Sequence, residues 1–179
     1  DVLFLSQLID HLAQNLSLDL DRVYSTGMSN GGFMSYELAC QLSDRIAAIA
    51  SVTGSMTPQT YSNCSPQRAV PVLQIHGLLD LVVPYSGNAI MTPIDDVMRY
   101  WSRKNNCSVT NETLTIPDSS GTGIGGRRES YKNCDNNTLV ELILLYGMGH
   151  DWPIANSIYR SHDIDAAETI WDFLSPFTL

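Results

Sequence analysis

The chain alternates short, nearly continuous apolar runs with longer segments of helical periodicity, and this alternation limits its fold more than any other feature. Continuous apolar runs are typical of strands buried on both faces, because their side chains meet neighbours on either side of the sheet. Strands that alternate with helices predict a parallel sheet covered by helices on both faces. We therefore predict a mostly parallel α/β fold, with strands within 22–26, 45–54, 69–77 and 137–150.

The segments between these runs supply the predicted helices. Apolar residues recur at helical spacing near the start of the chain, and a proline stands in the first turn of a later segment. We predict helices within 1–16, 30–44, 92–106 and 161–174, the last with Ser161 as its N-cap. Trp101 and Trp171 stand at core spacing on two of them. Residues 55–68, rich in Ser, Pro, Thr and Asn, are predicted to form a loop, and 108–134 to be β-structure interrupted by glycines.

The composition is that of a globular protein with an acidic surface. Of 179 residues, 44% are hydrophobic and 16% are charged, which is enough apolar material for one sizeable core. We therefore expect a single domain over 1–179. The formal net charge of -9 argues against nucleic acid or an anionic membrane as a partner, because like charges repel. No uninterrupted apolar run is long enough to cross a bilayer.

The four cysteines are spread along the chain and form no close pair. Zinc sites usually draw their ligands from closely spaced cysteines, so a metal site is not expected. Two disulfides formed in an oxidising compartment are the favoured interpretation, with free buried thiols as the alternative. Of the three possible pairings, we favour Cys40 with Cys64 and Cys107 with Cys134.

A serine bracketed by glycines follows the first predicted strand. The stretch Gly27-Met28-Ser29-Asn30-Gly31 matches the pattern G-x-S-x-G. In a nucleophile elbow, this pattern makes a sharp strand-to-helix turn that exposes the serine hydroxyl. The alternative is a loose surface turn in which small residues are merely tolerated. The strand predicted before the serine and the helix predicted after it favour the elbow.

A serine hydroxyl is a weak nucleophile unless a base accepts its proton and a third group orients that base. In α/β-hydrolases these groups follow the order serine, acid, histidine, each just after a strand. Asp80 comes after the strand predicted within 69–77 and is the candidate acid. Asp95 and Asp96 are alternatives, but they stand in the first turn of a predicted helix, where carboxylates commonly complement the helix dipole.

The candidate base is one of four histidines. His150 follows the last predicted strand, in a loop that also contains two glycines. His11 and His76 precede the acid and so break the expected order; the first is expected at the surface and the second packed at a strand end. His162 is expected at the start of the last helix. His150 is therefore the predicted base.

The roles follow from these positions. Ser29 would attack the carbonyl carbon of an ester, and His150 would accept its proton and return it to the leaving alcohol. Asp80 would hold the imidazole in the correct tautomer and stabilise its charged form. The backbone N–H of Asn30 would be one donor of the oxyanion hole.

Aromatic and apolar residues beside these positions are candidates for substrate binding. Tyr85 and Trp152 stand close in sequence to the proposed acid and base, and Met28 precedes the serine. Together they would form an apolar or aromatic acyl pocket. The alternative is that Trp152 only packs the histidine loop.

Three stretches, "RVYSTGMSNGGFMSYELAC", "VPVLQIHGLLDLVVPYSG" and "GMGHDWP", resemble successive blocks of the secreted esterases that include polyhydroxybutyrate depolymerases and feruloyl or acetylxylan esterases. The resemblance spans nearly the whole chain, and the cysteine stretches "KNNC" and "YKNC" also resemble that family. It implies the α/β-hydrolase fold, Ser29, Asp80 and His150 as a triad, and no metal or organic cofactor. It further implies a secreted or periplasmic protein that acts on a feruloyl, acetyl or hydroxybutyrate ester.

Two features depart from that family. Its members have a longer N-terminal half, which supplies early strands and the second oxyanion donor, whereas this chain opens at the helix before the serine strand. The opening residues also lack the basic start and the cleavage site of a secretory leader. We therefore expect the chain to be the C-terminal portion of the usual domain. The second departure is Asp151, directly after the predicted base, which we expect to face solvent.

Two other functions are compatible with parts of the pattern. Peptidases of the prolyl-oligopeptidase type also use G-x-S-x-G-G, but the "HDWP" stretch and the expected disulfides fit them less well. A hydrolase-fold binding protein without turnover would explain a missing oxyanion segment. It would have no need of a serine, an acid and a histidine in catalytic order, so an esterase is the predicted function.

Overall fold

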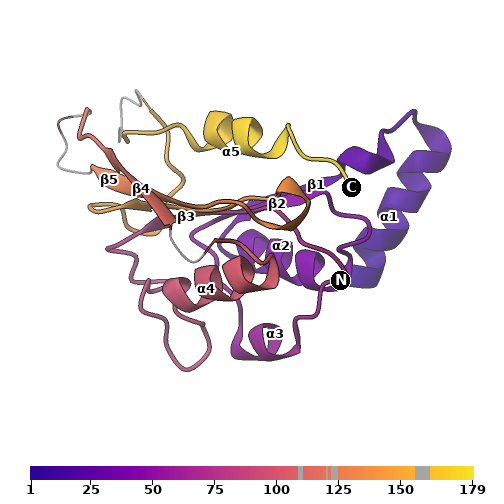
Figure 1. The fold of residues 1–179 in the computed structure, drawn as a ribbon, viewed down its shortest axis with the longest axis horizontal. Coiled ribbons are helices and arrows are strands. Elements are labelled where there is room, and N and C mark those ends of the chain that lie inside the picture. The colour runs from indigo at the N-terminus through magenta and orange to yellow at the C-terminus, as the bar shows by residue number, and fades with distance from the viewer. Residues whose placement is uncertain (109–110, 120, 122–124, 156–161) are drawn as a thin grey trace.

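The computed structural model describes residues 1–108, 111–119, 121, 125–155 and 162–179. Within them, the strands form one six-stranded sheet in the order β1-β2-β3-β6-β5-β4 (Figure 1). The first four strands in this order run parallel, and β5 and β4 add antiparallel at one edge. The strands are β1 (Tyr24–Met28), β2 (Ala48–Val52), β3 (Val72–Gly77), β4 (Asn111–Ile116), β5 (Gly126–Tyr131) and β6 (Val140–Leu145).

Helices cover both faces of the sheet, as predicted. Figure 1 shows α5 on one face and α2 and α4 on the other, with α3 beyond them and α1 at the β1 side of the sheet. Short 3-10 turns at Leu20–Arg22 and Asp135–Asn137 complete the pattern. The helices are α1 (Val2–Asn15), α2 (Asn30–Gln41), α3 (Pro58–Asn63), α4 (Ile94–Lys104) and α5 (Ala166–Leu174).

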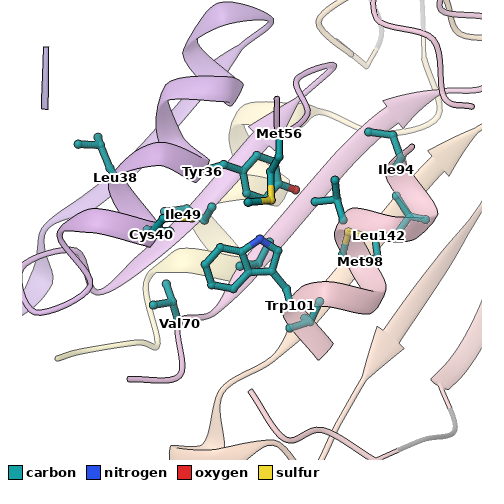
Figure 2. Packing of buried hydrophobic residues seen from close by; sticks show 14 of the residues in the cluster. Tyr36, Leu38, Cys40, Ile49, Met56, Val70, Ile94, Met98, Trp101 and Leu142 are labelled. Carbon is teal, nitrogen blue, oxygen red and sulfur yellow. The ribbon is translucent and has the colours of Figure 1, made fainter. Parts of the chain in front are cut away.

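The continuous apolar runs form strands because both faces of the sheet are buried. Every residue of β2 is buried, and its alternate side chains enter different core clusters. Ile49 packs on the side of α2 and α4, whereas Ala50 and Val52 pack on the side of α5. On the first side, Trp101 from α4 stacks on Tyr36 from α2 with ring centroids 6.3 Å apart (Figure 2).

Three local predictions need correction. Residues 55–68 are not all loop, because α3 begins there with Pro58 in its first turn and the Thr57 hydroxyl accepting the Thr60 N–H. Ser161 lies outside the described residues, and α5 instead begins after Asp165, whose carboxylate accepts the Glu168 N–H. Trp171 is 60% exposed, although Trp101 is fully buried. Neither a polar N-cap nor the burial of a single helix residue is therefore fixed by sequence spacing alone.

Two disulfides join segments that lie outside the sheet. They join Cys40 to Cys64 and Cys107 to Cys134, the two pairs that the sequence favours. The first links the end of α2 to the end of α3, and the second links the segment after α4 to the segment after β5. No helix in the part of the chain that the structure describes is both long and apolar enough to cross a membrane.

Candidate active site

Ser29 lies in a sharp turn between β1 and α2. Its φ of 54° and ψ of -118° are outside the regions that residues other than glycine usually occupy. The turn is held from both sides, because the Ser29 N–H donates to Val52 O at 2.9 Å and Ser29 O accepts the Phe33 N–H at 3.0 Å. The structure thus has the strand, strained serine and helix that a nucleophile elbow requires.

The glycines around Ser29 permit close packing of the helix on the strands. A Cβ on Gly27 would lie 2.8 Å from the Cα of Gly31, closer than side chains approach backbone. A Cβ on Gly32 would lie 2.4 Å from Ser51 Oγ and 3.0 Å from the Cα of Gly54. The first turn of α2 therefore rests directly on the ends of β1 and β2, which holds the serine in place.

Asn30 is the first residue of α2. The first N–H groups of a helix have no partner within that helix, and they lie at its electropositive end. The N–H of Asn30 directly follows the Ser29 carbonyl. It is therefore suited to bind an oxyanion that forms beside the serine.

Asp80 is a buried carboxylate with every oxygen engaged. It is 2% exposed, and its Oδ1 accepts the N–H groups of Val82 and Val83 at 2.8 and 2.9 Å. Its Oδ2 lies 2.8 Å from Nδ1 of His150. An ionised carboxylate only accepts hydrogen bonds, so the His150 proton sits on Nδ1. Nε2 of His150 is then free to accept a proton, as a general base must.

Backbone contacts hold the Asp80 and His150 loops together. The N–H of Leu79 donates to Met148 O at 3.0 Å, and the N–H of Leu78 donates to Leu145 O at 2.9 Å. A Cβ on Gly77 would lie 2.1 Å from Met148 O, so only glycine allows this approach. The hydrogen bond between acid and base therefore spans two loops that already contact each other.

The serine lies at the same edge of the sheet as this pair. β1, β3 and β6 run parallel, so their carboxyl ends meet at one edge, where ligand sites of open α/β sheets form. Ser29 follows β1, Asp80 follows β3, and His150 follows β6. β2 lies between β1 and β3, and β6 lies beside β3. The arrangement suits a nucleophile, a base and an acid acting together.

A family model described as Phospholipase/Carboxylesterase matches residues 2–99, more than half of the chain. The match includes Ser29 and Asp80. The chain belongs to the phospholipase/carboxylesterase family. The resemblance to esterases that the sequence motifs indicate is thereby confirmed.

Relatives of this carboxylesterase family member are named as esterases. The putative esterase NocK of Nocardia uniformis subsp. tsuyamanensis is 28% identical over 97% of this chain and 57% of its own length. Feruloyl esterase B of Piromyces equi is 30% identical over 84% of this chain and 28% of that protein. The bifunctional acetylxylan esterase/xylanase XynS20E of Neocallimastix patriciarum is 27% identical over 100% of this chain and 24% of that protein. The chain therefore spans little more than half, or less, of these relatives.

A solved structure of the same architecture is the acetyl xylan esterase from Aspergillus awamori. It matches with a TM-score of 0.68, at 13% identity, over 97% of this chain and 66% of that chain. At this identity the likeness shows the fold alone, and that fold is the α/β-hydrolase fold predicted from sequence.

The other candidate acids and histidines of the chain make contacts outside the Asp80–His150 hydrogen bond. Asp95 accepts the Tyr85 hydroxyl and Asp96 pairs with Arg99, both at the start of α4. His11 is exposed on α1, as expected. His76 is fully buried at the end of β3, also as expected.

His162 and Asp151 differ from their predictions. His162 is not part of α5 but is buried before it, where its Nδ1 accepts the Ile154 N–H at 3.4 Å. Its Nε2 lies 3.5 Å from Oδ2 of Asp151, whose Oδ1 accepts the Trp152 N–H. Asp151 therefore turns back onto the protein, contrary to the expectation that it faces solvent. The contact between His162 and Asp151 therefore holds the segment that follows His150.

The three predicted substrate residues do not gather on one side of the sheet. Met28 and Trp152 pack against the core cluster on the side of α5. Tyr85 packs against the cluster on the side of α2 and α4, and its hydroxyl donates to Asp95. Burial, with Asp95 as a smaller cause, raises the pKa of Tyr85 above its ordinary value. The Tyr85 hydroxyl is therefore already occupied within the protein.

Two buried polar groups near the site were not predicted. Thr53 directly follows β2, has a φ of 47° and is fully buried, and its hydroxyl has no hydrogen-bond partner among the described residues. The Gln74 side chain joins Tyr36 to His76 inside the core. The only sequence signal for either is a polar residue within an otherwise apolar run.

Proposed function

We propose that this chain carries the catalytic triad of a serine carboxylic ester hydrolase, formed by Ser29, His150 and Asp80. The observation that carries the proposal is the 2.8 Å hydrogen bond between His150 Nδ1 and Asp80 Oδ2, at the sheet edge where the strained Ser29 also lies. Membership of the carboxylesterase family and relatives named as esterases support it.

The reaction would proceed in two halves. Ser29 Oγ attacks the ester carbonyl carbon while His150 Nε2 accepts its proton, and the Asn30 N–H binds the oxyanion. The tetrahedral intermediate collapses, the alcohol leaves with the proton from His150, and an acyl-serine remains. Water then attacks the acyl group as His150 accepts a proton, and the carboxylic acid is released with Ser29 restored. Asp80 keeps the imidazole oriented throughout.

The proposed substrates are feruloyl or acetyl esters of plant polysaccharides, with aliphatic polyesters such as poly(3-hydroxybutyrate) as a further class. Names of relatives, feruloyl esterase and acetylxylan esterase, support the first two. Met28 and Trp152 are the candidates for contact with the acyl group. Two disulfides fit an oxidising compartment and support a secreted or periplasmic protein.

We further propose that residues 1–179 form one catalytic domain that corresponds to the C-terminal portion of longer esterases. The extent of the relatives supports a correspondence to part of a longer protein, since the chain spans 57% of NocK. The second oxyanion donor would then belong to a segment outside 1–179. If so, these residues alone bind a transition state with one oxyanion donor fewer, and loss of such a donor typically costs about 2.7–4 kcal/mol of barrier.

The test is labelling with a fluorophosphonate, read by intact mass, with Ser29→Ala and the exposed loop variant Ser86→Ala as a matched control. We expect one label on the wild type and on Ser86→Ala, and none on Ser29→Ala, because the activated serine is the only group that reacts. Turnover of phenyl acetate, methyl ferulate and a polyester film then orders the substrates, and a prolyl peptide amide tests the peptidase alternative. A folded Ser29→Ala protein that still takes the label would refute the triad.

A further inference from the structure

The loop that carries Asp80 has little apolar packing to hold it. It connects β3 to the segment before α4, and most of its apolar side chains point outward. The exposed fractions are 44% for Leu78, 59% for Leu79, 91% for Leu81 and 59% for Val82. Among residues 78–83, only Asp80 and Val83 are buried, each at 2% exposure. Hydrogen bonds must therefore fix the position of the carboxylate.

His76 supplies one of these hydrogen bonds from beneath the loop. It is fully buried, and its Nε2 lies 2.9 Å from Val83 O. The N–H of the same Val83 donates to Asp80 Oδ1 at 2.9 Å. Val83 thus links the imidazole to the carboxylate, since its carbonyl faces His76 and its N–H faces Asp80. The contact from His76 therefore connects the start of the loop to its end.

The tautomer of His76 follows from its partners. The Tyr36 hydroxyl donates to Gln74 Oε1 at 2.7 Å, so the amide group of Gln74 faces His76 as a donor. Gln74 Nε2 lies 2.9 Å from His76 Nδ1, which must then accept. The proton of a neutral His76 is therefore on Nε2 and donates to Val83 O.

The surroundings keep this ring neutral. Burial is the largest effect and lowers the pKa of His76, although the Val83 carbonyl and Asp80 act in the opposite direction. The titratable groups that face it are Asp80, whose Oδ2 is 3.9 Å from Nε2, His150, and Tyr85, whose ring centroid is 6.0 Å away. His76 therefore binds the loop as a neutral hydrogen-bond donor and not as a charged group.

We propose that His76 is a positioning residue for Asp80: its Nε2–H holds Val83 O, and the Val83 and Val82 amides in turn hold the carboxylate against His150. The role in catalysis rests on the proposed function, since it requires Asp80 and His150 to act as acid and base. The positioning itself can be measured without turnover.

Two substitutions separate a donor from a packing residue. His76→Gln retains an amide donor near the position of Nε2, whereas His76→Leu retains apolar volume and no donor. If the hydrogen bond to Val83 O matters, the Gln variant resembles the wild type and the Leu variant is impaired. If His76 only fills space, the order is reversed. Tyr100→Phe is the matched control, because it removes a tyrosine hydrogen bond, to Cys64 O, that belongs neither to the loop nor to the partners of His76.

The first measurement is an NMR spectrum of the protein labelled with 15N in histidine. We expect His76 as the neutral Nε2–H tautomer at pH 7, and a protected Nδ1–H proton on His150 donated to Asp80. His76→Leu should lose the protected His150 proton, while His76→Gln and Tyr100→Phe keep it. A charged or Nδ1–H His76 in the wild type overturns the proposal even if no variant folds.

The second measurement is the rate of ester hydrolysis. In His76→Leu we expect kcat/KM to fall about 10- to 100-fold, as a misplaced catalytic group commonly causes, whereas His76→Gln should stay near the wild-type rate. A folded His76→Leu protein with the wild-type rate and the wild-type His150 proton refutes the positioning role. Absence of turnover in a folded wild type refutes the proposed function instead, and leaves the NMR result to decide the role of His76.

Discussion

Two residues that are not glycine adopt positive φ angles at equivalent positions of neighbouring strands. Met28 of β1 pairs with Val52 of β2, and the next residues are Ser29 with φ 54° and Thr53 with φ 47°. Strained conformations of this kind cost about 1–3 kcal/mol each and gather at functional sites. The Ser29 strain belongs to the elbow, while Thr53 turns the chain so that Gly54 lies against Gly32. The backbone is therefore strained both in the serine turn and in the turn that follows the neighbouring strand.

Thr53 carries a second cost, because its buried hydroxyl has no hydrogen-bond partner among the described residues. Thr53→Val replaces the hydroxyl with a methyl group of similar shape, and it should raise the free energy of unfolding by about 1 kcal/mol, the lower end of the cost of a buried unpaired group. Urea denaturation measures the change, with exposed Thr115→Val as the control. A loss of stability in Thr53→Val would mean that the hydroxyl has a partner.

At the scale of elements, the contact between α2 and the sheet decides where the serine lies. The helix starts immediately after Ser29, and its first turn approaches β2 closely because Gly32 has no side chain. Gly31, one residue earlier, faces open space, and a Cβ at that position would have no neighbouring atom within 4 Å. Packing against the sheet therefore requires the absence of a side chain at Gly32 but not at Gly31.

This difference predicts opposite effects of the same substitution. Gly32→Ala places a methyl group 2.4 Å from Ser51 Oγ, and overpacking of this kind typically costs about 1–3 kcal/mol. Gly31→Ala should instead stabilise by up to about 1 kcal/mol, because alanine is the better helix former. Thermal and urea unfolding of both variants measure the pair. Equal destabilisation by the two substitutions would show that α2 does not pack as described.

At the scale of the whole molecule, tyrosines with a raised pKa gather on one side of the sheet. Tyr36 is part of the core cluster on the side of α2 and α4, and Tyr85, Tyr100 and Tyr131 pack against it. Burial is the largest cause that raises the pKa of each above its ordinary value of 10.0. All four of these tyrosines therefore lie on the side of α2 and α4.

These tyrosines predict alkaline destabilisation. Because each folded-state pKa is raised, the folded protein binds more protons than the unfolded chain above pH ~10, and stability falls as pH rises further. A fully buried tyrosine such as Tyr36 contributes a slope of about 1.4 kcal/mol per pH unit in that range. Urea unfolding between neutral pH and pH ~11 measures it, and Tyr36→Phe should have a shallower slope. An identical slope in that variant would contradict the assignment.

The sequence alone predicts the layers of this protein and the order of its elements. Apolar runs such as 45–54 can only be buried on both faces, and the context of Ser29 between a strand and a helix is local. The short α3 escaped prediction, because its start at Thr57 depends on one capping hydrogen bond within a polar stretch.

Only the tertiary structure decides which groups meet at the sheet edge. The sequence favours Asp80 over Asp95 and Asp96 only by its place after a strand. Its hydrogen bond to His150 forms because β3 and β6 are neighbours in the sheet and not in the chain. The same holds for His76, whose role depends on a loop that folds back over it. Hydrogen bonds between residues distant in sequence depend on the packing of the elements that carry them, and no local pattern records that packing.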